Sequence, residues 1–258
     1  MHVYLSLFGL RIPSYGFFIA LGVILANMAA LFVLKKTGQD FNDFTILEAY
    51  CILGAFTGAK VLYLMVSFEK INWKRVTDSL YFSGLMQKGF VFYGGLIGGL
   101  LFVFMAGKFH KIKSEPYIRN FVFLIPFIHG FGRIGCFMAG CCYGIPYKGI
   151  GAVVFPEGSY ALAGVSLFPV QLLEAILLIM TALILINLQI RKKWFYTIET
   201  YLLIYGIIRF CLEYLRYDEE RGSFAGLSTS QWISIALILG ACTSIFVNRK
   251  KRTGRCNA

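Results

Sequence analysis

Blocks of about twenty consecutive apolar residues recur along this 258-residue chain and constrain its fold more than any other feature. A helix of that length crosses the roughly 30 Å hydrocarbon core of a bilayer. The blocks are apolar on all sides, whereas a helix on a water-soluble core keeps a polar face. Only 15% of the residues are charged, against about a quarter in soluble domains. The pattern predicts one all-α integral membrane domain over residues 1–258 with about seven transmembrane helices, at Ile12–Leu34, Phe44–Val66, Phe90–Met105, Phe121–Phe137, Phe168–Leu188, Tyr196–Leu215 and Gln231–Val247.

The lysines and arginines between the apolar blocks predict the orientation of the chain. With the N-terminus outside, fourteen of the 25 basic residues fall on the cytoplasmic side, eight fall on the opposite side, and three lie within or at the edge of spans. This bias favours an N-out, C-in topology by the positive-inside rule. Loops 67–89 and 138–167 then lie outside the cytoplasm, and the basic tail 248–258 lies inside. The net charge of +12 thereby has a membrane explanation, which excludes nucleic-acid binding as its cause.

An arginine within the fourth apolar block is the first candidate for function. Arg133 lies in a glycine-rich stretch that runs from His129 to Gly144. A charge inside a span is costly unless it is paired or solvated, and glycine allows tight turns and the close approach of a ligand. Arginine suits a phosphate, because its planar fork donates paired hydrogen bonds to anionic oxygens. The alternative is an interfacial arginine that reaches lipid headgroups.

Two further groups of polar residues fall near the ends of spans. Arg209 and Glu213 are four residues apart and share one helix face, and Arg216 follows three residues later. These side chains either neutralise one another or offer spare Arg209 donors to an anion, with Glu213 holding the arginine in place. Gln171 and Glu174 lie near the start of the fifth block, where Glu174 is expected to help cap the helix.

Three clustered cysteines, Cys136, Cys141 and Cys142, leave several interpretations open. Together with His129 they offer soft ligands, but their spacing matches no standard zinc pattern, and no metal or cofactor is expected. A cysteine close to Arg133 and His129 can instead act as a nucleophile, and two cysteines can pair on the oxidising side of a membrane. The simplest interpretation is that small side chains pack a glycine-rich turn.

The glycine-rich stretch resembles the signature of prolipoprotein diacylglyceryl transferases, which usually reads Gly-Arg-Ile-Gly-Asn-Phe-x-Asn-Gly-Glu-x-x-Gly. In this chain it reads Gly132-Arg-Ile-Gly-Cys-Phe-Met-Ala-Gly-Cys-Cys-Tyr-Gly144. Other segments are similar to motifs of that family, in the same order over nearly the whole chain: Arg11-Ile-Pro-Ser-Tyr15-Gly16, Gly58-Ala-Lys60-x-x-Tyr63, Tyr93-Gly94-Gly95, Pro169-Val-Gln171-Leu-Leu-Glu174, Arg209-Phe-Cys-Leu-Glu213-Tyr-Leu-Arg216 and Ser230-Gln231.

The resemblance implies a seven-span enzyme of the prokaryotic cytoplasmic membrane. Such enzymes transfer a diacylglyceryl group from phosphatidylglycerol to the lipobox cysteine of an exported prolipoprotein and release glycerol phosphate. By this resemblance Arg133 and Arg209 hold the phosphate, Glu213 orients Arg209, and Tyr15 binds the headgroup. Together with the residues identified above, we expect the catalytic residues to be Arg133, Arg209, Tyr93, Glu213, Cys136 and Cys141. We expect the substrate-binding residues to be Tyr15, Gly94, Gly95, Gly144, Gln171, Glu174 and His129.

The chain departs from the family pattern at several polar positions. Tyr93 replaces a histidine that is a candidate base, and a phenol with a pKa of about 10 is a poorer base at neutral pH. Cys136, Ala139 and Cys141 replace the Asn, Asn and Glu of the signature. His129 or a cysteine thiolate can serve as the base instead. Two alternatives follow: a transferase of the same fold with a different acceptor, and a membrane protein that binds or translocates lipid without catalysis.

Overall fold

The computed structural model describes residues 3–7, 9–87, 89, 91–217 and 223–256. Within these ranges four helices are long and apolar enough to cross a membrane: α1 (Ser14–Thr37), α2 (Phe41–Val66), α7 (Val170–Lys192) and α9 (Thr229–Cys256). A fifth candidate is the pair α5 (Ser114–Phe121) and α6 (Leu124–Ala139), which bends by 41° at a short break. Two shorter helices are α4 (Phe92–Phe109) and α8 (Thr197–Leu212). These spans agree with an all-α membrane fold, and the number of seven remains a prediction.

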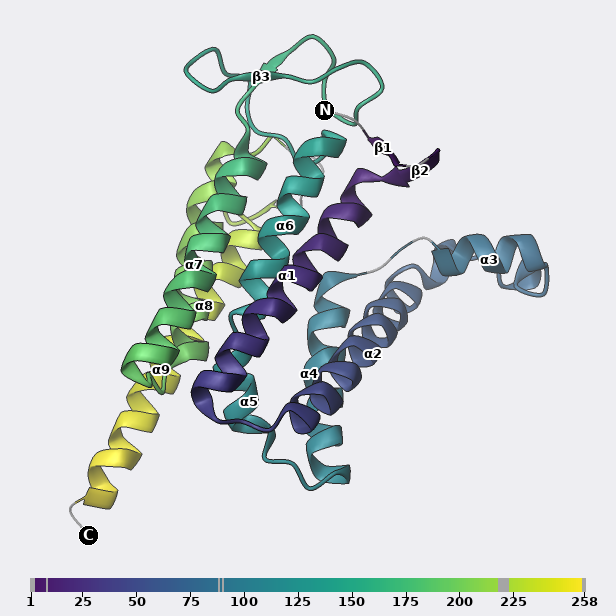
Figure 1. Cartoon of the computed structure of the whole chain (residues 1–258). Helices are drawn as coiled ribbons and strands as arrows, with labels where there is room; N and C mark the ends of the chain where they lie inside the picture. The colour runs from purple at the N-terminus through teal and green to yellow at the C-terminus, as the bar shows by residue number, and fades with distance from the viewer. Residues whose placement is uncertain (1–2, 8, 88, 90, 218–222, 257–258) are drawn as a thin grey trace. The chain divides into compact units, whose positions relative to one another are not determined.

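Residues 1–37 and 118–258 form one compact unit. In this unit α1 packs against α6, α6 against α7, α7 against α8, and α8 against α9 (Figure 1). Glycines let the backbones approach closely. A Cβ atom on Gly22 of α1 would lie 2.6 Å from the Cβ of Phe131 in α6, and one on Gly130 of α6 would lie 2.9 Å from Ile179 of α7. Between helices in lipid, such close packing is a main source of stability.

Three short antiparallel hairpins complete the first unit, and the sequence pattern did not predict them. They are β1 (Tyr4–Leu7) with β2 (Leu10–Pro13), β3 (Val153–Val154) with β4 (Ser166–Leu167), and β5 (Ser223–Phe224) with β6 (Leu227–Ser228). Ile12, which was predicted to begin the first span, lies in β2, and α1 begins at Ser14. Around β3 and β4 the loop has its own small apolar core at Phe155 and Leu167, which explains its order.

Residues 38–117 form a second compact unit, in which α2 packs against α4. Asp40 caps α2 by accepting a 2.9 Å hydrogen bond from the backbone N–H of Asp43. Short 3₁₀ helices at Phe68–Lys70 and Trp73–Arg75 and the helix α3 (Ser79–Gln87) follow α2. The two long helices touch through glycines, since a Cβ on Gly58 would lie 2.2 Å from the carbonyl oxygen of Gly94. The Gly-x-x-x-Gly of α2 is therefore a helix-packing face.

Candidate active site

A buried carboxylate joins two arginines from different parts of the first unit. Oε2 of Glu174, on α7, lies 3.0 Å from Nε of Arg133 on α6 and 3.6 Å from Nη1 of Arg216, which follows α8. Glu174 is 1% exposed. The prediction that Glu174 caps its helix is wrong, because α7 begins after Pro169 without a side-chain cap and the carboxylate is engaged by the arginines. Pairing the charges in this way makes their burial tolerable.

A second ion pair lies at the end of α8. Nη2 of Arg209 is 2.8 Å from Oε2 of Glu213 and donates a 2.9 Å hydrogen bond to Oγ of Ser230 at the start of α9. Arg209 and Glu213 thus form an ion pair, as their spacing of four residues predicted, and the role of Glu213 in a site remains a prediction. The other terminal nitrogen of Arg209, Nη1, is buried and has no hydrogen-bond partner among the described residues. Such a donor is costly to leave unpaired and is suited to an anionic ligand.

Gly144 brings the two ion pairs together through the backbone. Its N–H donates to the carbonyl of Phe168 at 3.2 Å, just before α7, and the next N–H, of Ile145, donates to the carbonyl of Leu215 at 3.0 Å. Gly144 also forms an isolated β-bridge with Arg216. A Cβ on Gly144 would lie 2.6 Å from the carbonyl oxygen of Phe168 and 2.8 Å from that of Leu215. Only glycine fits without displacing one of these strands of chain.

Arginines outnumber glutamates among the described residues of the combined cluster. Among the described residues three arginines, at 133, 209 and 216, pair with two glutamates, at 174 and 213. His129, one turn before Arg133 on α6, lies within electrostatic range of Arg133, Glu174, Arg209 and Arg216. The cluster is therefore suited to bind an anion beside an imidazole.

The three cysteines converge beside this cluster. Cys136 lies in the last turn of α6, and Gly140 ends the helix in a left-handed conformation with φ of 78°. Cys141 and Cys142 follow, and the sulfur atoms of all three lie within 4.8 Å of one another. Nε2 of Gln171 donates a 2.8 Å hydrogen bond to the carbonyl of Cys141, and a role of Gln171 in substrate binding remains a prediction.

Tyr15 lies near the start of α1 and is within electrostatic range of Arg133 and the three cysteines. Its backbone is close to α6, because a Cβ on Gly135 would lie 2.9 Å from the Cα of Tyr15. The tyrosine is 48% exposed. An exposed phenol next to a buried arginine cluster is placed to contact the rim of a bound ligand.

Tyr93, Gly94 and Gly95 lie at the start of α4 in the second unit. Gly94 packs against Gly58, and a Cβ on Gly95 would lie 3.2 Å from the carbonyl oxygen of Ala55, so both glycines serve the contact with α2. Tyr93 is 46% exposed. The roles of these three residues in a site remain predictions.

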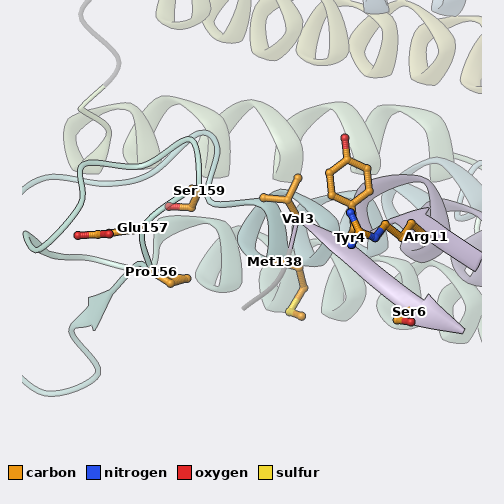
Figure 2. A pocket seen from close by; sticks show the side chains of 9 residues that line it. Val3, Tyr4, Ser6, Arg11, Met138, Pro156, Glu157 and Ser159 are labelled. Carbon is orange, nitrogen blue, oxygen red and sulfur yellow. The ribbon is translucent and has the colours of Figure 1, made fainter. Parts of the chain in front are cut away.

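A hollow of about 520 Å³ lies between the β1–β2 hairpin and the loop that follows α6 (Figure 2). It is lined by Val3, Tyr4, Ser6, Arg11, Met138, Pro156, Glu157, Gly158 and Ser159. Arg11 and Glu157 bring opposite charges to the same hollow. None of the residues predicted to be catalytic lines it, so this hollow is distinct from the arginine–glutamate cluster.

Two members of the cluster were missing from the predicted site. Arg216 was identified only as a neighbour of Glu213, whereas its carboxylate partner is Glu174, and Ser230 was noted only as part of a motif. Spacing along one helix reveals pairs three or four residues apart. It cannot reveal partners that come from a different helix.

Fold and site together define a polytopic helical membrane protein with a buried cluster of arginines and glutamates. Residues 2–247 match the family model of prolipoprotein diacylglyceryl transferase, and the chain belongs to that family. It is 36% identical to the phosphatidylglycerol–prolipoprotein diacylglyceryl transferase 2 of Clostridium perfringens, over 96% of this chain and 97% of that protein. Identity is 34% with the phosphatidylglycerol–prolipoprotein diacylglyceryl transferase of Clostridium tetani, over 92% and 93% of the two chains. With the phosphatidylglycerol–prolipoprotein diacylglyceryl transferase 1 of Clostridium perfringens it is 28%, over 96% of each.

Proposed function

We propose that this protein transfers the diacylglyceryl group of phosphatidylglycerol to the cysteine thiol of an exported prolipoprotein. The observation that carries the proposal is that Nη1 of Arg209 is buried without a hydrogen-bond partner among the described residues, beside Arg133 and Arg216. A buried donor without an acceptor costs about 1–3 kcal/mol. A phosphate oxygen relieves that cost. The names of the relatives supply the substrate pair.

The reaction makes one carbon–sulfur bond and breaks one carbon–oxygen bond. The thiolate attacks the glyceryl carbon that carries the phosphodiester, and the phosphate oxygen leaves with the bonding electrons as part of glycerol phosphate. The thiol proton passes to a base and finally to the phosphate or to water. Negative charge thus grows on the phosphate in the transition state. Arginines already held in place stabilise that charge without reorganisation.

The glutamates of the cluster position the arginines and do not contact the reacting atoms. Glu213 orients Arg209, and Glu174 fixes Arg133 and Arg216 relative to each other. Tyr15 contacts the glycerol headgroup at the exposed rim. Two side chains can take the thiol proton: Tyr93, at the position of the family histidine, and His129, among the arginines. A pH–rate profile of Tyr93→Phe and His129→Gln identifies the base, because only loss of the base removes the acidic limb of the profile.

We further propose seven spans with the N-terminus outside, in the cytoplasmic membrane. α4 has 18 residues and rises about 27 Å at about 1.5 Å per residue, which is close to the hydrocarbon thickness. α8 continues into the 3₁₀ turn at Glu213–Leu215 and supplies the other additional span. The cluster then faces the outer leaflet, where exported proteins emerge. Reporter fusions after residues 37, 113, 193 and 256 should all report a cytoplasmic location.

The test uses purified full-length protein in liposomes of phosphatidylglycerol with a lipobox peptide. Released glycerol phosphate and the mass of the peptide are followed together, with a Cys→Ser peptide as control. A diacylglyceryl mass shift that requires the peptide cysteine is the expected result. Glycerol phosphate without a modified peptide would indicate another acceptor or hydrolysis. Lipid binding with neither product would indicate a non-catalytic lipid-binding protein.

Arg209→Lys tests the observation on which the proposal rests. Lysine keeps the ion pair with Glu213 but loses the second donor of the guanidinium. A hydrogen bond to a charged group is worth about 1.5–3 kcal/mol, so kcat/KM should fall by about 10- to 150-fold. Arg191→Lys, at an exposed position near the end of α7, is the control and should leave kcat/KM unchanged. Full activity of Arg209→Lys would show that Nη1 does not bind the phosphate.

A further inference from the structure

We propose that Cys136, Cys141 and Cys142 form a three-thiolate site for a thiophilic metal ion, Zn²⁺ or Cu⁺. All three cysteines are free, none of them is exposed, and their sulfur atoms lie within 4.8 Å of one another. Thiolates are the ligands that both ions prefer in proteins. The site goes beyond the transfer reaction, which uses the arginines of the neighbouring cluster.

The distances suit a metal with only small movements of the side chains. In a tetrahedral zinc site with Zn–S bonds of about 2.3 Å, sulfur atoms lie about 3.8 Å apart. The sulfurs here need to approach by at most about 1 Å, which rotation about χ1 provides. A fourth position is left open to water or an exchangeable ligand, the arrangement found in zinc sites that are not purely structural.

The backbone is shaped to bring the sulfurs together. Gly140 ends α6 in the left-handed region, and Cys142 itself has φ of 58°. A non-glycine residue in that region is uncommon and costs about 1–2 kcal/mol. The N–H of Cys141 donates to the carbonyl of Cys136 at 3.1 Å, and Gln171 holds the carbonyl of Cys141. The left-handed conformation of Cys142 accompanies a reversal of the chain after α6, and this reversal brings Cys141 and Cys142 next to Cys136. Simple packing of a small side chain gives no reason for that conformation.

Positive charge lies beside the three sulfurs. Cys142 is within electrostatic range of Arg133 and Arg216, and Cys136 is within range of Arg133. A thiolate is the form that binds metal. Zn²⁺ with three thiolates carries a net charge of minus one, opposite in sign to the neighbouring Arg133 and Arg216.

The paired-arm spacing of ordinary zinc motifs is absent because two of the ligands are adjacent in sequence. In an ordinary zinc motif, two pairs of ligands come from two separate segments. Here the adjacent Cys141 and Cys142 supply one pair, and Cys136 in the last turn of α6 supplies the third ligand. The left-handed residues at 140 and 142 make this short loop possible. Proximity in the folded chain therefore supports a metal site where the spacing along the sequence predicted none.

The test is a metal titration of the full-length protein in detergent, stripped of metal and reduced with a non-thiol reductant. Zn²⁺ and Cu⁺ are added separately against a coloured chelator, and Co²⁺ is used to detect the thiolate charge-transfer band. We expect one equivalent of Zn²⁺ or Cu⁺ bound, with release of protons from the thiols. The ion that binds more tightly in these two titrations is the one for which the site is suited.

Single substitutions assign the ligands. Cys136→Ser, Cys141→Ser and Cys142→Ser should each weaken binding by at least about tenfold, since even indirect disturbance of a metal site costs that much. Cys242→Ser, on the exposed face of α9, is the matched control and should change nothing. Absence of a stoichiometric ion in the reduced wild type, or the absence of a charge-transfer band with Co²⁺, would overturn the proposal. Tight binding that persists in Cys142→Ser would overturn it as well.

Discussion

The first unit holds two buried ion clusters that differ in how completely they are satisfied. In the first, Nη1 of Arg119 on α5 lies 3.3 Å from Oε2 of Glu199 on α8 and donates a 3.0 Å hydrogen bond to the carbonyl of Phe195. Oε1 of Glu199 accepts a 2.9 Å hydrogen bond from Ser244 of α9. Arg119 also stacks 4.1 Å from the centre of the Phe195 ring. Among the described residues one positive charge meets one negative charge here, and we call this cluster closed.

We call the second cluster, of Arg133, Arg209, Arg216, Glu174 and Glu213, the open cluster. Its arginines outnumber its carboxylates, and Arg209 keeps a buried nitrogen without a hydrogen-bond partner among the described residues. A closed cluster holds helices together. A cluster with an unpaired buried donor can bind an anion, and the unpaired donor lowers the stability of the fold. Both clusters are buried, so the difference between them among the described residues is the ratio of arginines to carboxylates, on which the proposed phosphate site rests.

Arg119→Ala should have the largest effect, and the effect should be on stability. It leaves Glu199, which is 4% exposed, without a cation. Breaking a buried pair in this way costs about 3–5 kcal/mol. Thermal and denaturant unfolding in detergent should show this loss, while kcat of the folded fraction stays within about twofold of wild type. A stable Arg119→Ala protein would mean that the closed cluster does not hold the helices together.

Arg133→Ala should reverse this pattern. Glu174 keeps Arg216, and the cluster becomes charge-balanced, so unfolding should change far less than in Arg119→Ala. Loss of one preorganised cation at the phosphate should lower kcat by about 100- to 1000-fold. Glycerol phosphate release and unfolding are measured on the same preparation. Activity near that of wild type would show that Arg133 does not act on the phosphate. A large loss of stability would show that the second cluster holds helices together, as the first does.

Gly144→Ala should affect both properties, to a smaller extent. The added Cβ must displace the carbonyl of Phe168 or of Leu215, and overpacking of this kind costs about 1–3 kcal/mol. Either displacement moves Arg216 relative to Glu174, so activity falls with stability. Gly107→Ala is the matched control in the second unit, where a Cβ would lie 2.9 Å from the carbonyl of Ile112. Gly107→Ala should lose stability while kcat is retained. An equal loss of kcat in Gly107→Ala and Gly144→Ala would show that Gly144 has no specific role in the site.

The sequence predicted the open cluster better than it predicted the closed one. Arg133 and Arg209 were identified because charges in apolar blocks are rare, and Glu213 because it lies one turn from Arg209. The pairing of Glu174 with Arg133 was not predicted, since the two residues are 41 positions apart and meet only through helix packing. The hairpins were missed because strands of two to four residues carry too little periodicity. The three cysteines come together because Gly140 and Cys142 adopt the left-handed conformation, which the sequence pattern did not predict.

Tyr15→Phe should have the smallest effect and should locate the rim of the open cluster. The phenol is half exposed, and loss of one neutral hydrogen bond costs about 0.5–1.5 kcal/mol. The KM for phosphatidylglycerol should therefore rise by about 2- to 10-fold while kcat hardly changes, because the headgroup is bound equally in the ground and transition states. Tyr160→Phe, on an exposed loop, is the control. A large fall in kcat for Tyr15→Phe would place this tyrosine among the reacting groups, and the open cluster would then extend to the start of α1.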